Sequence, residues 1–307
     1  MYDCIIVGGG IAGLQAAIQL GRYGRRILVV DRGDGRSTLC RSYHNVLGYP
    51  DGVSGETLRR IGREQAAKYG AEFAEADATG AAKSEDGAFR LQCRPDSVYL
   101  GKTLLLATGV MDRIPDMPGL RSCLGLTAYI CPDCDGYEIK DKHTLVLGSG
   151  NTGARMALAL KYYTPHLIYV NHEQKPVDAA IAERLRNAGI TITVEPVREV
   201  FHEGAAEEGS FAGVILANGK KLEADRAFIA FGGNEVRSDL ASQLGAERME
   251  NLHIITDPRS KMTSVPGVWA AGDVAVHSEQ LTIAMGEGQQ AAIWIHKWLL
   301  RQRKREE

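Results

Sequence analysis

The chain has 307 residues, which is about two domains at roughly 150 residues each. Hydrophobic residues make up 44% and charged residues 24% of the chain, as in soluble globular proteins. The formal net charge of −2 gives no electrostatic reason to expect nucleic acid or an anionic membrane as a partner. With no apolar run of about 18 residues and no visible targeting segment, we expect a cytoplasmic protein and no membrane span.

The first elements form a strand, a glycine turn, a helix and a second strand. The strand covers 2–7, the helix runs to about Leu20, and the second strand covers 27–30 and ends at Asp31. This order is one βαβ half of a nucleotide-binding fold. Further predicted elements are a helix over 55–69 and strands near 71–76, 88–93, 97–100 and 103–107.

The same plan returns later in the chain. A strand at 144–147 precedes a second glycine turn, a helix runs to about Tyr162, and another strand covers 167–170. The spacing from Gly8 to Asp31 and from Gly148 to Asn171 is 23 positions in both copies. The remaining predicted elements are strands at 227–231 and 268–273, a helix over 281–300, and linkers near 111–118 and 232–237.

These patterns predict an α/β fold with two Rossmann-like, three-layer nucleotide-binding domains. The last block of the chain resembles a partner of the first, so we expect the second domain to be inserted in the first. The predicted boundaries are 1–114 with 238–307 for the discontinuous domain, and 115–237 for the inserted one.

The first glycine turn has every part of a dinucleotide site. Its glycines let the backbone approach a pyrophosphate, amides at the helix start point at the phosphates, and the acid at the strand end can bind a ribose hydroxyl. The expected cofactor-binding residues here are Gly8, Gly10, Ile11, Ala12, Gly13, Asp31 and Arg32.

The second turn lacks the acid at the strand end, where Asn171 stands. An acid favours the 2′-hydroxyl of NADH, and arginines favour the 2′-phosphate of NADPH. Asn171 indicates neither NADH nor NADPH, and Glu173 would disfavour the 2′-phosphate of NADPH if it faced the ribose. A degenerate site that binds nothing is the alternative. The expected nucleotide-binding residues are Gly148, Gly150, Asn151, Thr152, Gly153, Asn171 and His172.

Between the two turns lies a C-x-x-C pair, Cys131 and Cys134. A helix start would lower a thiol pKa here, whereas nearby acids would raise it. Asp135 is placed to protonate a leaving thiolate. A zinc site would need a second pair of ligands, and only Cys123 and His143 lie near, at poor spacing. We therefore expect a redox dithiol and no metal.

Together these residues resemble the low-molecular-weight thioredoxin reductase family of pyridine nucleotide–disulfide oxidoreductases, over essentially the whole chain. Besides the glycine turns and the dithiol, the carriers are the Thr108-Gly109 pair and the late Ala271-Gly272-Asp273. The stretches from His44 to Gly48 and from Cys131 to Glu138 are similar to the branch that acts on small-molecule disulfides. The resemblance implies FAD in the first domain and NADPH in the second. This chain has Asn171-His172-Glu173 where the NADPH-dependent members carry His-Arg-Arg, so NADH is a candidate as well.

The resemblance also implies roles for particular residues. Cys134 faces the flavin, Cys131 attacks the outside disulfide, and Asp135 is the acid/base. Gly272 and Asp273 hold the ribityl chain and pyrophosphate, and the helix starting near Leu281 points its N-terminus at the flavin. The other cofactor-binding residues carried over are His44, Asn45, Thr108, Gly109, Gln280 and Thr282. As single histidines, His44, His172 and His277 are not expected to be ligands of a metal.

The leading hypothesis is an FAD-dependent dithiol/disulfide oxidoreductase that takes electrons from NADPH or NADH. Its partner would be a thioredoxin-like protein or a small-molecule disulfide, and the resemblance implies a homodimer. The alternatives are ferredoxin as the donor, a dithiol oxidase that passes electrons to oxygen, a non-enzymatic flavin-binding redox sensor, and a flavin reductase with an idle dithiol.

Overall fold

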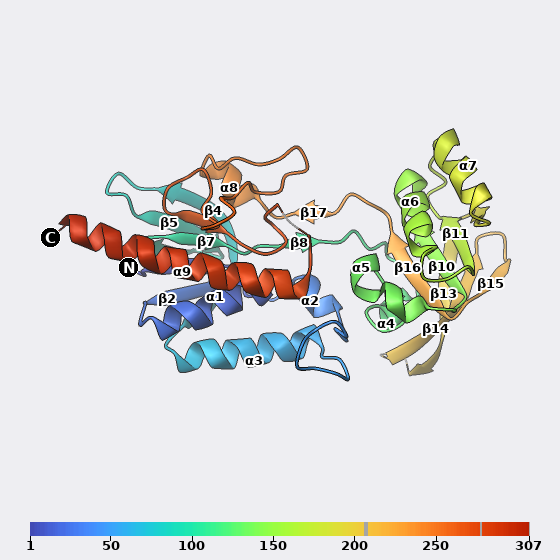
Figure 1. Ribbon diagram of the computed structural model, residues 1–307, viewed down its shortest axis with the longest axis horizontal. Helices are drawn as coiled ribbons and strands as arrows, with labels where there is room; N and C mark the ends of the chain where they lie inside the picture. The colour runs from blue at the N-terminus through green and yellow to red at the C-terminus, as the bar shows by residue number, and fades with distance from the viewer. Residues whose placement is uncertain (206–207, 277, 307) are drawn as a thin grey trace. The chain divides into compact units, whose positions relative to one another are not determined.

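The computed structural model describes residues 1–205, 208–276 and 278–306, so His277 lies outside the described residues (Figure 1). The chain forms two compact units. The first comprises Met1–Thr38, Gly55–Met111 and Glu235–Glu307; the second comprises Leu39–Ser54 and Asp112–Asn234. The second unit is thus inserted in the first, and it also includes the segment 39–54, which the expected range 1–114 had placed in the first domain.

Five parallel strands form the central sheet of the first unit, in the order β18-β7-β1-β2-β3. The central strand β1 (Cys4–Val7) pairs with β2 (Ile27–Asp31) and with β7 (Leu104–Leu106). The outer pairs are β2 with β3 (Glu72–Glu75) and β7 with β18 (Val268–Ala270). Runs of Ile, Leu and Val make β1, β2 and β7 apolar on both sides, as a covered parallel sheet requires.

Alternate residues of this sheet enter two different cores. Ile6 packs in a core with the helices α1 (Ile11–Arg22) and α9 (Leu281–Glu306). Ile5 points the other way, into a core that contains Phe89 of an antiparallel sheet. The unit therefore has three layers: helices, a parallel sheet and an antiparallel sheet (Figure 1). Its other elements are α2 (Arg36–Leu39), α3 (Gly55–Lys68), α8 (Asp239–Gln243), β4 (Asp77–Lys83), β5 (Phe89–Arg94) and β6 (Ser97–Gly101).

The second unit repeats this plan, with the strand order β12-β11-β10-β16-β9. Its central strand β10 (Thr144–Gly148) pairs in parallel with β11 (Leu167–Asn171) and β16 (Arg226–Ala230). The edges are β12 (Thr191–Thr193) and β9 (Ala128–Tyr129).

The second sheet also divides its side chains between two cores. Val146 packs with α6 (Gly150–Leu160) and α7 (Ala179–Asn187), and Leu145 packs with Val214 of an antiparallel sheet. The predicted fold class, two Rossmann-like three-layer units, is confirmed. The other elements are α4 (Leu120–Cys123), α5 (Pro132–Asp135), the 3₁₀ helix η1 (Gly136–Ile139), β13 (Val197–Ala205), β14 (Glu208–Leu216) and β15 (Lys221–Glu223).

Some boundaries differ from those expected. The last helix continues to Glu306 instead of ending at 300, because its final turns are rich in Arg, Lys and Glu, which propagate a helix well. The strand at Asp77–Lys83 was not predicted, since its Ala and Gly residues give no strand signal. The chain passes between the units through β8 (Val110–Met111) and β17 (Glu235–Val236), which pair antiparallel. Among the described residues, no helix is both long and apolar enough to cross a membrane.

Candidate active site

Cys131 and Cys134 form a disulfide at the start of a short helix. Cys131 has extended backbone torsions and caps α5, and Pro132 takes the first helical position, where its missing N–H costs nothing. The backbone N–H of Cys134 donates to Cys131 Sγ at 3.2 Å. A hydrogen bond donated to a cysteine sulfur favours the thiolate form, and this N–H is placed to donate to Cys131 Sγ.

Asp135 is the last residue of α5 and follows Cys134 directly. Burial, with a further contribution from the negative charge of Glu138, raises the pKa of Asp135 to about 7. A carboxyl group with this pKa is protonated in a large fraction of molecules near neutral pH. It can therefore give a proton to a thiolate that leaves the neighbouring dithiol.

The segment that contains His44 and Asn45 lies in the second unit, with the dithiol helix. His44 Nδ1 is 3.3 Å from Glu138 Oε1, and its Nε2 is 3.0 Å from Ser42 Oγ. In the same segment, burial and then the charge of Asp135 raise the pKa of Cys40 to about 12. Cys40 thus remains a thiol at neutral pH and does not compete as a nucleophile.

The first glycine turn joins β1 to α1 and is tight at its ends and open in its middle. Gly8 has a φ of 107°, and a Cβ on it would lie 2.2 Å from the carbonyl oxygen of Ala107. A Cβ on Gly13 would lie 1.9 Å from the oxygen of Gly8. Around Gly10, no described atom comes within 4 Å of a Cβ, and α1 begins at Ile11 with no side-chain cap. This cradle fits a pyrophosphate held by backbone N–H groups.

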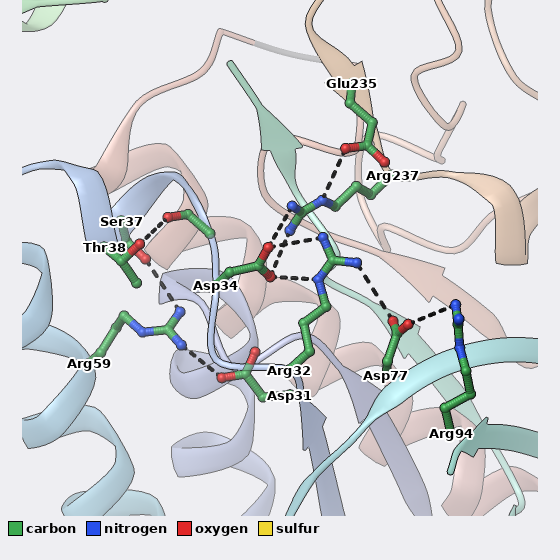
Figure 2. A network of polar contacts seen from close by, with 11 residues as sticks. Asp31, Arg32, Asp34, Ser37, Thr38, Arg59, Asp77, Arg94, Glu235 and Arg237 are labelled. Atoms are coloured by element: carbon green, nitrogen blue, oxygen red, sulfur yellow. Dashed lines mark hydrogen bonds and ion pairs between the residues drawn. The ribbon is translucent and has the colours of Figure 1, made fainter. Parts of the chain in front are cut away.

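Asp31 ends β2 and faces the same turn. A Cβ on Gly9 would lie 2.7 Å from Asp31 Oδ2, so only glycine fits opposite the carboxylate. Arg59 reaches the carboxylate from α3 and donates from Nη2 to Oδ2 at 2.7 Å (Figure 2). The two side chains are only 11% and 14% exposed. The pair holds a charged carboxylate at the place where a ribose hydroxyl binds in this fold.

Arg32 belongs to a network of charges beside this pair, shown in Figure 2. Its guanidinium binds Asp34 at 2.6 Å and lies 3.6 Å from Asp77, which also pairs with Arg94 at 3.1 Å. Arg237, just after β17, holds the other side of Asp34 at 2.9 Å. Burial raises the pKa of Asp34, but the two guanidinium groups outweigh it and lower this pKa overall. The network links the loop after β2 to Arg237, which follows β17.

Two further motifs end neighbouring strands of the first unit. Thr108 and Gly109 follow β7, where Thr108 Oγ1 donates to the carbonyl oxygen of Arg237 and Gly109 accepts from the Arg237 N–H. Gly272 follows β18, and its N–H donates to Glu287 Oε2 of α9 at 3.0 Å. The Glu287 side chain is 6% exposed, and its other oxygen accepts from Lys261 at 2.8 Å.

The start of α9 carries a second group of charges. Arg36 Nη1 donates to Asp273 Oδ2 at 3.0 Å and also pairs with Glu279. Gln280 precedes the first turn of α9, and its carbonyl oxygen accepts from the N–H of Ala284. Of the other two residues predicted here, Leu281 is buried and Thr282 is exposed.

The second glycine turn joins β10 to α6 in the same manner. A Cβ on Gly148 would lie 2.5 Å from the oxygen of Ala230, and one on Gly153 would lie 2.4 Å from the ring of Tyr169. Gly150 has a φ of 48°. The helix α6 begins with no side-chain cap and no acid in its first turn, so its end fits a phosphate. The other two predicted residues, Asn151 and Thr152, are the second and third of α6.

Both polar atoms of the buried Asn171 side chain bond within the protein. Its Oδ1 accepts from the N–H of Gly150 at 3.0 Å, and its Nδ2 donates to the oxygen of Lys175 at 2.7 Å. His172 Nδ1 accepts from the N–H of Val197 at 2.9 Å, and burial lowers the pKa of this ring although Glu173 opposes the shift. Asn171 ends β11 and His172 follows it, so both residues lie at the carboxyl end of this strand, as expected.

Several charged residues of these sites gave no motif in the sequence. Because the partners of an ion pair lie far apart in the chain, periodicity and spacing do not reveal them. One signal was present: Glu287 interrupts the buried face of α9. The charged residues that no sequence motif revealed are Arg36, Arg59, Arg113, Lys261 and Glu287. Among the described residues, no group of three or more His, Cys, Asp and Glu is placed to hold a metal ion.

The profile of the family described as pyridine nucleotide-disulphide oxidoreductase matches residues 2–288. The chain belongs to this family. Thioredoxin reductase of Aquifex aeolicus (strain VF5) is 30% identical over 99% of this chain and 95% of its own length. Thioredoxin reductase of Treponema pallidum (strain Nichols) is 32% identical over 95% of each chain.

Two solved structures are similar to this chain over nearly its whole length. The crystal structure of HlmI has a TM-score of 0.87 and 29% identity, over 99% of this chain and 94% of that chain. A putative thioredoxin reductase, TrxB from Bacillus anthracis, has a TM-score of 0.85 and 25% identity, over 99% and 100%. The chain is a flavin-dependent disulfide oxidoreductase of the thioredoxin reductase type, a family that uses FAD and a pyridine nucleotide.

Proposed function

We propose that the chain passes electrons from NADPH or NADH through FAD to the Cys131–Cys134 pair, and from there to an outside disulfide. The observation that carries this proposal is the dithiol itself, with a hydrogen bond donor at Cys131 Sγ and an acid of pKa about 7 next to Cys134. The two glycine turns, each opening an uncapped helix, support one nucleotide site in each unit.

The exchange with the outside disulfide follows from these groups. The Cys131 thiolate attacks one sulfur of the substrate disulfide, forms a mixed disulfide and expels the other sulfur as a thiolate. Asp135 supplies the proton that this leaving group takes up. The Cys134 thiolate then attacks Cys131 Sγ, expels the second substrate thiolate and restores the Cys131–Cys134 disulfide, so that two electrons have passed to the substrate.

Bound FAD would supply the two-electron transfer between the nucleotide and the dithiol. The residues of the first unit would hold it: the N–H groups around Gly10 at its pyrophosphate, Asp31 at its ribose, and the Gly272-Asp273 turn farther along. The Gly272 turn is rigid because Glu287 binds its N–H from α9. The residues around Gly150 would hold the phosphates of the nucleotide in the second unit.

The test is an anaerobic titration of the FAD-loaded protein with NADH and, separately, with NADPH, following the bleaching of the flavin absorbance. Bleaching by either nucleotide, followed by reduction of an added disulfide, supports the proposal. Cys131→Ser and Cys134→Ser should keep the bleaching and lose disulfide reduction. Full turnover with Cys131→Ser would instead indicate a flavin reductase with an idle dithiol, and would contradict the proposal.

The physiological disulfide is proposed to be that of a thioredoxin-like protein, because the relatives that cover nearly the whole chain are named thioredoxin reductases. A small-molecule disulfide is the second candidate, favoured by the His44 and Cys131 segments. Donation by ferredoxin, or passage of electrons to oxygen, is favoured by the lack of arginines at 171–173. Failure of both nucleotides to bleach the flavin, with dithionite effective, would support those alternatives. The homodimer and the cytoplasmic location stay predictions.

A further inference from the structure

We propose that Glu173 is the ribose-binding residue of the second nucleotide site and that it selects NADH over NADPH. This inference rests on the proposed function, since it assigns the donor of that site. The proposed selective residue lies two positions beyond the end of β11. The 23-position spacing from Gly8 to Asp31 in the first copy would instead place it at Asn171.

Asn171 itself is only 2% exposed, and both polar atoms of its side chain already bond within the protein. Its carbonyl oxygen accepts from the N–H of Gly150 and its amide donates to the oxygen of Lys175. These bonds hold the glycine turn and the loop after β11 in one conformation. Asn171 therefore shapes the site and leaves the recognition of the ribose to its neighbours.

His172 is also engaged. Its Nδ1 accepts from Val197 of β13, and its ring meets that of Phe231 edge to face, with centroids 5.7 Å apart. Because Nδ1 is an acceptor, a neutral ring carries its proton on Nε2. Such a ring has no positive charge with which to bind a 2′-phosphate.

Glu173 is the remaining group, and its carboxylate is less buried than the Asn171 amide, although both of its oxygens pair with cations. Its side chain is 20% exposed, and its Oε2 lies 2.8 Å from Lys175 Nζ and 3.4 Å from Arg113 Nη1. Lys175, which pairs with this carboxylate, lies beside the glycine turn: a Cβ on Gly150 would be 3.2 Å from the Cβ of Lys175. Arg113, then Lys175 and the nearby hydroxyl of Ser149, lower the pKa of Glu173 to about 2, so it is ionised at every physiological pH.

The charge of Glu173 decides between the two nucleotides. A carboxylate accepts hydrogen bonds from the 2′- and 3′-hydroxyls of NADH. The negatively charged 2′-phosphate of NADPH would lie beside the same carboxylate, and the two like charges would repel each other. Arg113 and Lys175 cannot offset this repulsion in full, because both already pair with Glu173. Neutralising Glu173 would release both cations toward a phosphate.

The experiment measures binding of NAD⁺ and NADP⁺ to the FAD-loaded protein by isothermal titration calorimetry, so that it does not depend on turnover. We expect the wild type to bind NAD⁺ at least about tenfold more tightly than NADP⁺. Glu173→Gln should weaken NAD⁺, strengthen NADP⁺ and shift the ratio by about a hundredfold. Adding Lys175→Ala, which keeps the Cβ against Gly150, should remove the gain for NADP⁺. Glu183→Gln, an equal change of charge at an exposed position of α7, is the matched control and should change neither affinity.

Wild-type protein that binds NADP⁺ as tightly as NAD⁺ would overturn the role of Glu173, and so would an unchanged ratio in Glu173→Gln. Either result leaves the proposed function intact if one nucleotide bleaches the flavin. The expected binding pattern without any bleaching would support Glu173 and contradict the proposed electron path. Binding of neither nucleotide would contradict both.

Discussion

The carboxylate of Glu287 joins the N–H of Gly272 to the ammonium of Lys261, one oxygen to each. Glu287 lies in the helix α9, whereas Gly272 belongs to the turn after β18. The turn that is proposed to hold part of the FAD therefore depends on a charge buried in a helix that follows it in the chain. Two groups, the Gly272 N–H and the Lys261 ammonium, lose this carboxylate as a partner if it is removed.

Glu287→Ala should destabilise the protein by about 3 kcal/mol, because it removes the buried carboxylate that pairs with Lys261 and accepts from the Gly272 N–H. Thermal unfolding of the FAD-loaded protein would show this as a Tm lowered by about 6–12 °C. Glu287→Gln keeps an acceptor for the Gly272 N–H and should lose less than Glu287→Ala. An unchanged Tm in both variants would show that the contact does not stabilise the turn.

Asp135→Asn should change the pH dependence of both rate and stability. Since the pKa of Asp135 is raised to about 7, the folded state holds a proton that the unfolded state releases. The cost of ionising the buried carboxyl is absent below about pH 4 and fully present above about pH 7, where it reaches roughly 4 kcal/mol. Asp135→Asn should therefore raise the Tm at about pH 8 and leave it nearly unchanged at about pH 4.

The same variant should lower the rate of disulfide exchange by about a hundredfold, the usual contribution of a general acid. In the wild type this rate should fall as the pH rises through about 7, because the acid form is lost. Asp133→Asn is the matched control, as an exposed acid of the same short helix. A wild-type profile that stays flat between about pH 6 and 8 would exclude Asp135 as the proton donor.

Gly288→Ala should separate α9 from α1. A Cβ on Gly288 would lie 2.1 Å from the carbonyl oxygen of Ala12, and neither helix backbone can move without disturbing the core. We expect a loss of at least about 2 kcal/mol. Gly286→Ala, on the same helix, meets no described atom within 4 Å of its Cβ and should raise stability by about 0.5–1 kcal/mol. Chemical denaturation would compare the two, and equal effects would contradict this account.

Arg59→Ala should cost about 3 kcal/mol, because it leaves the Asp31 carboxylate unpaired in a site where both side chains are mostly buried. Arg60→Ala, one position along α3, removes only an exposed pair with Glu64 and should cost at most about 0.5 kcal/mol. Thermal unfolding of both variants, with the FAD content measured in parallel, would check this. A loss in Arg60→Ala equal to that in Arg59→Ala would show that burial of the pair is unimportant.

The parallel sheets and the inserted domain were predictable because runs of Ile, Leu and Val and the two glycine turns mark them locally. The turn at Gly8, for example, needs a φ of 107° and lies against the backbone at Ala107, which only glycine permits. The antiparallel sheet at 197–223 was not predicted. Its strands alternate Val and Phe with many charged residues and contain a register shift, so the local pattern is weak.

The site was predictable where chemistry lies in neighbouring residues and unpredictable where it depends on distant ones. Cys131, Cys134 and Asp135 occupy one turn of the chain, so their spacing indicates their chemistry. Arg113 and Glu173, in contrast, meet across 60 positions, and nothing in the sequence marks them as partners. The grouping of His44 with Glu138 depends likewise on how the chain returns to the dithiol helix.

The bonds of Asn171 to Gly150 and Lys175 also bear on how the two halves of the chain have diverged. Both halves keep the 23-position spacing from first glycine to strand end, as expected for duplicated units. In the first half that end is an acid, stabilised by an arginine from a helix of its own unit; in the second it is an amide that closes its own loop. A comparison of relatives at this aligned position alone would therefore compare a residue proposed to bind a ribose with one that holds its own loop.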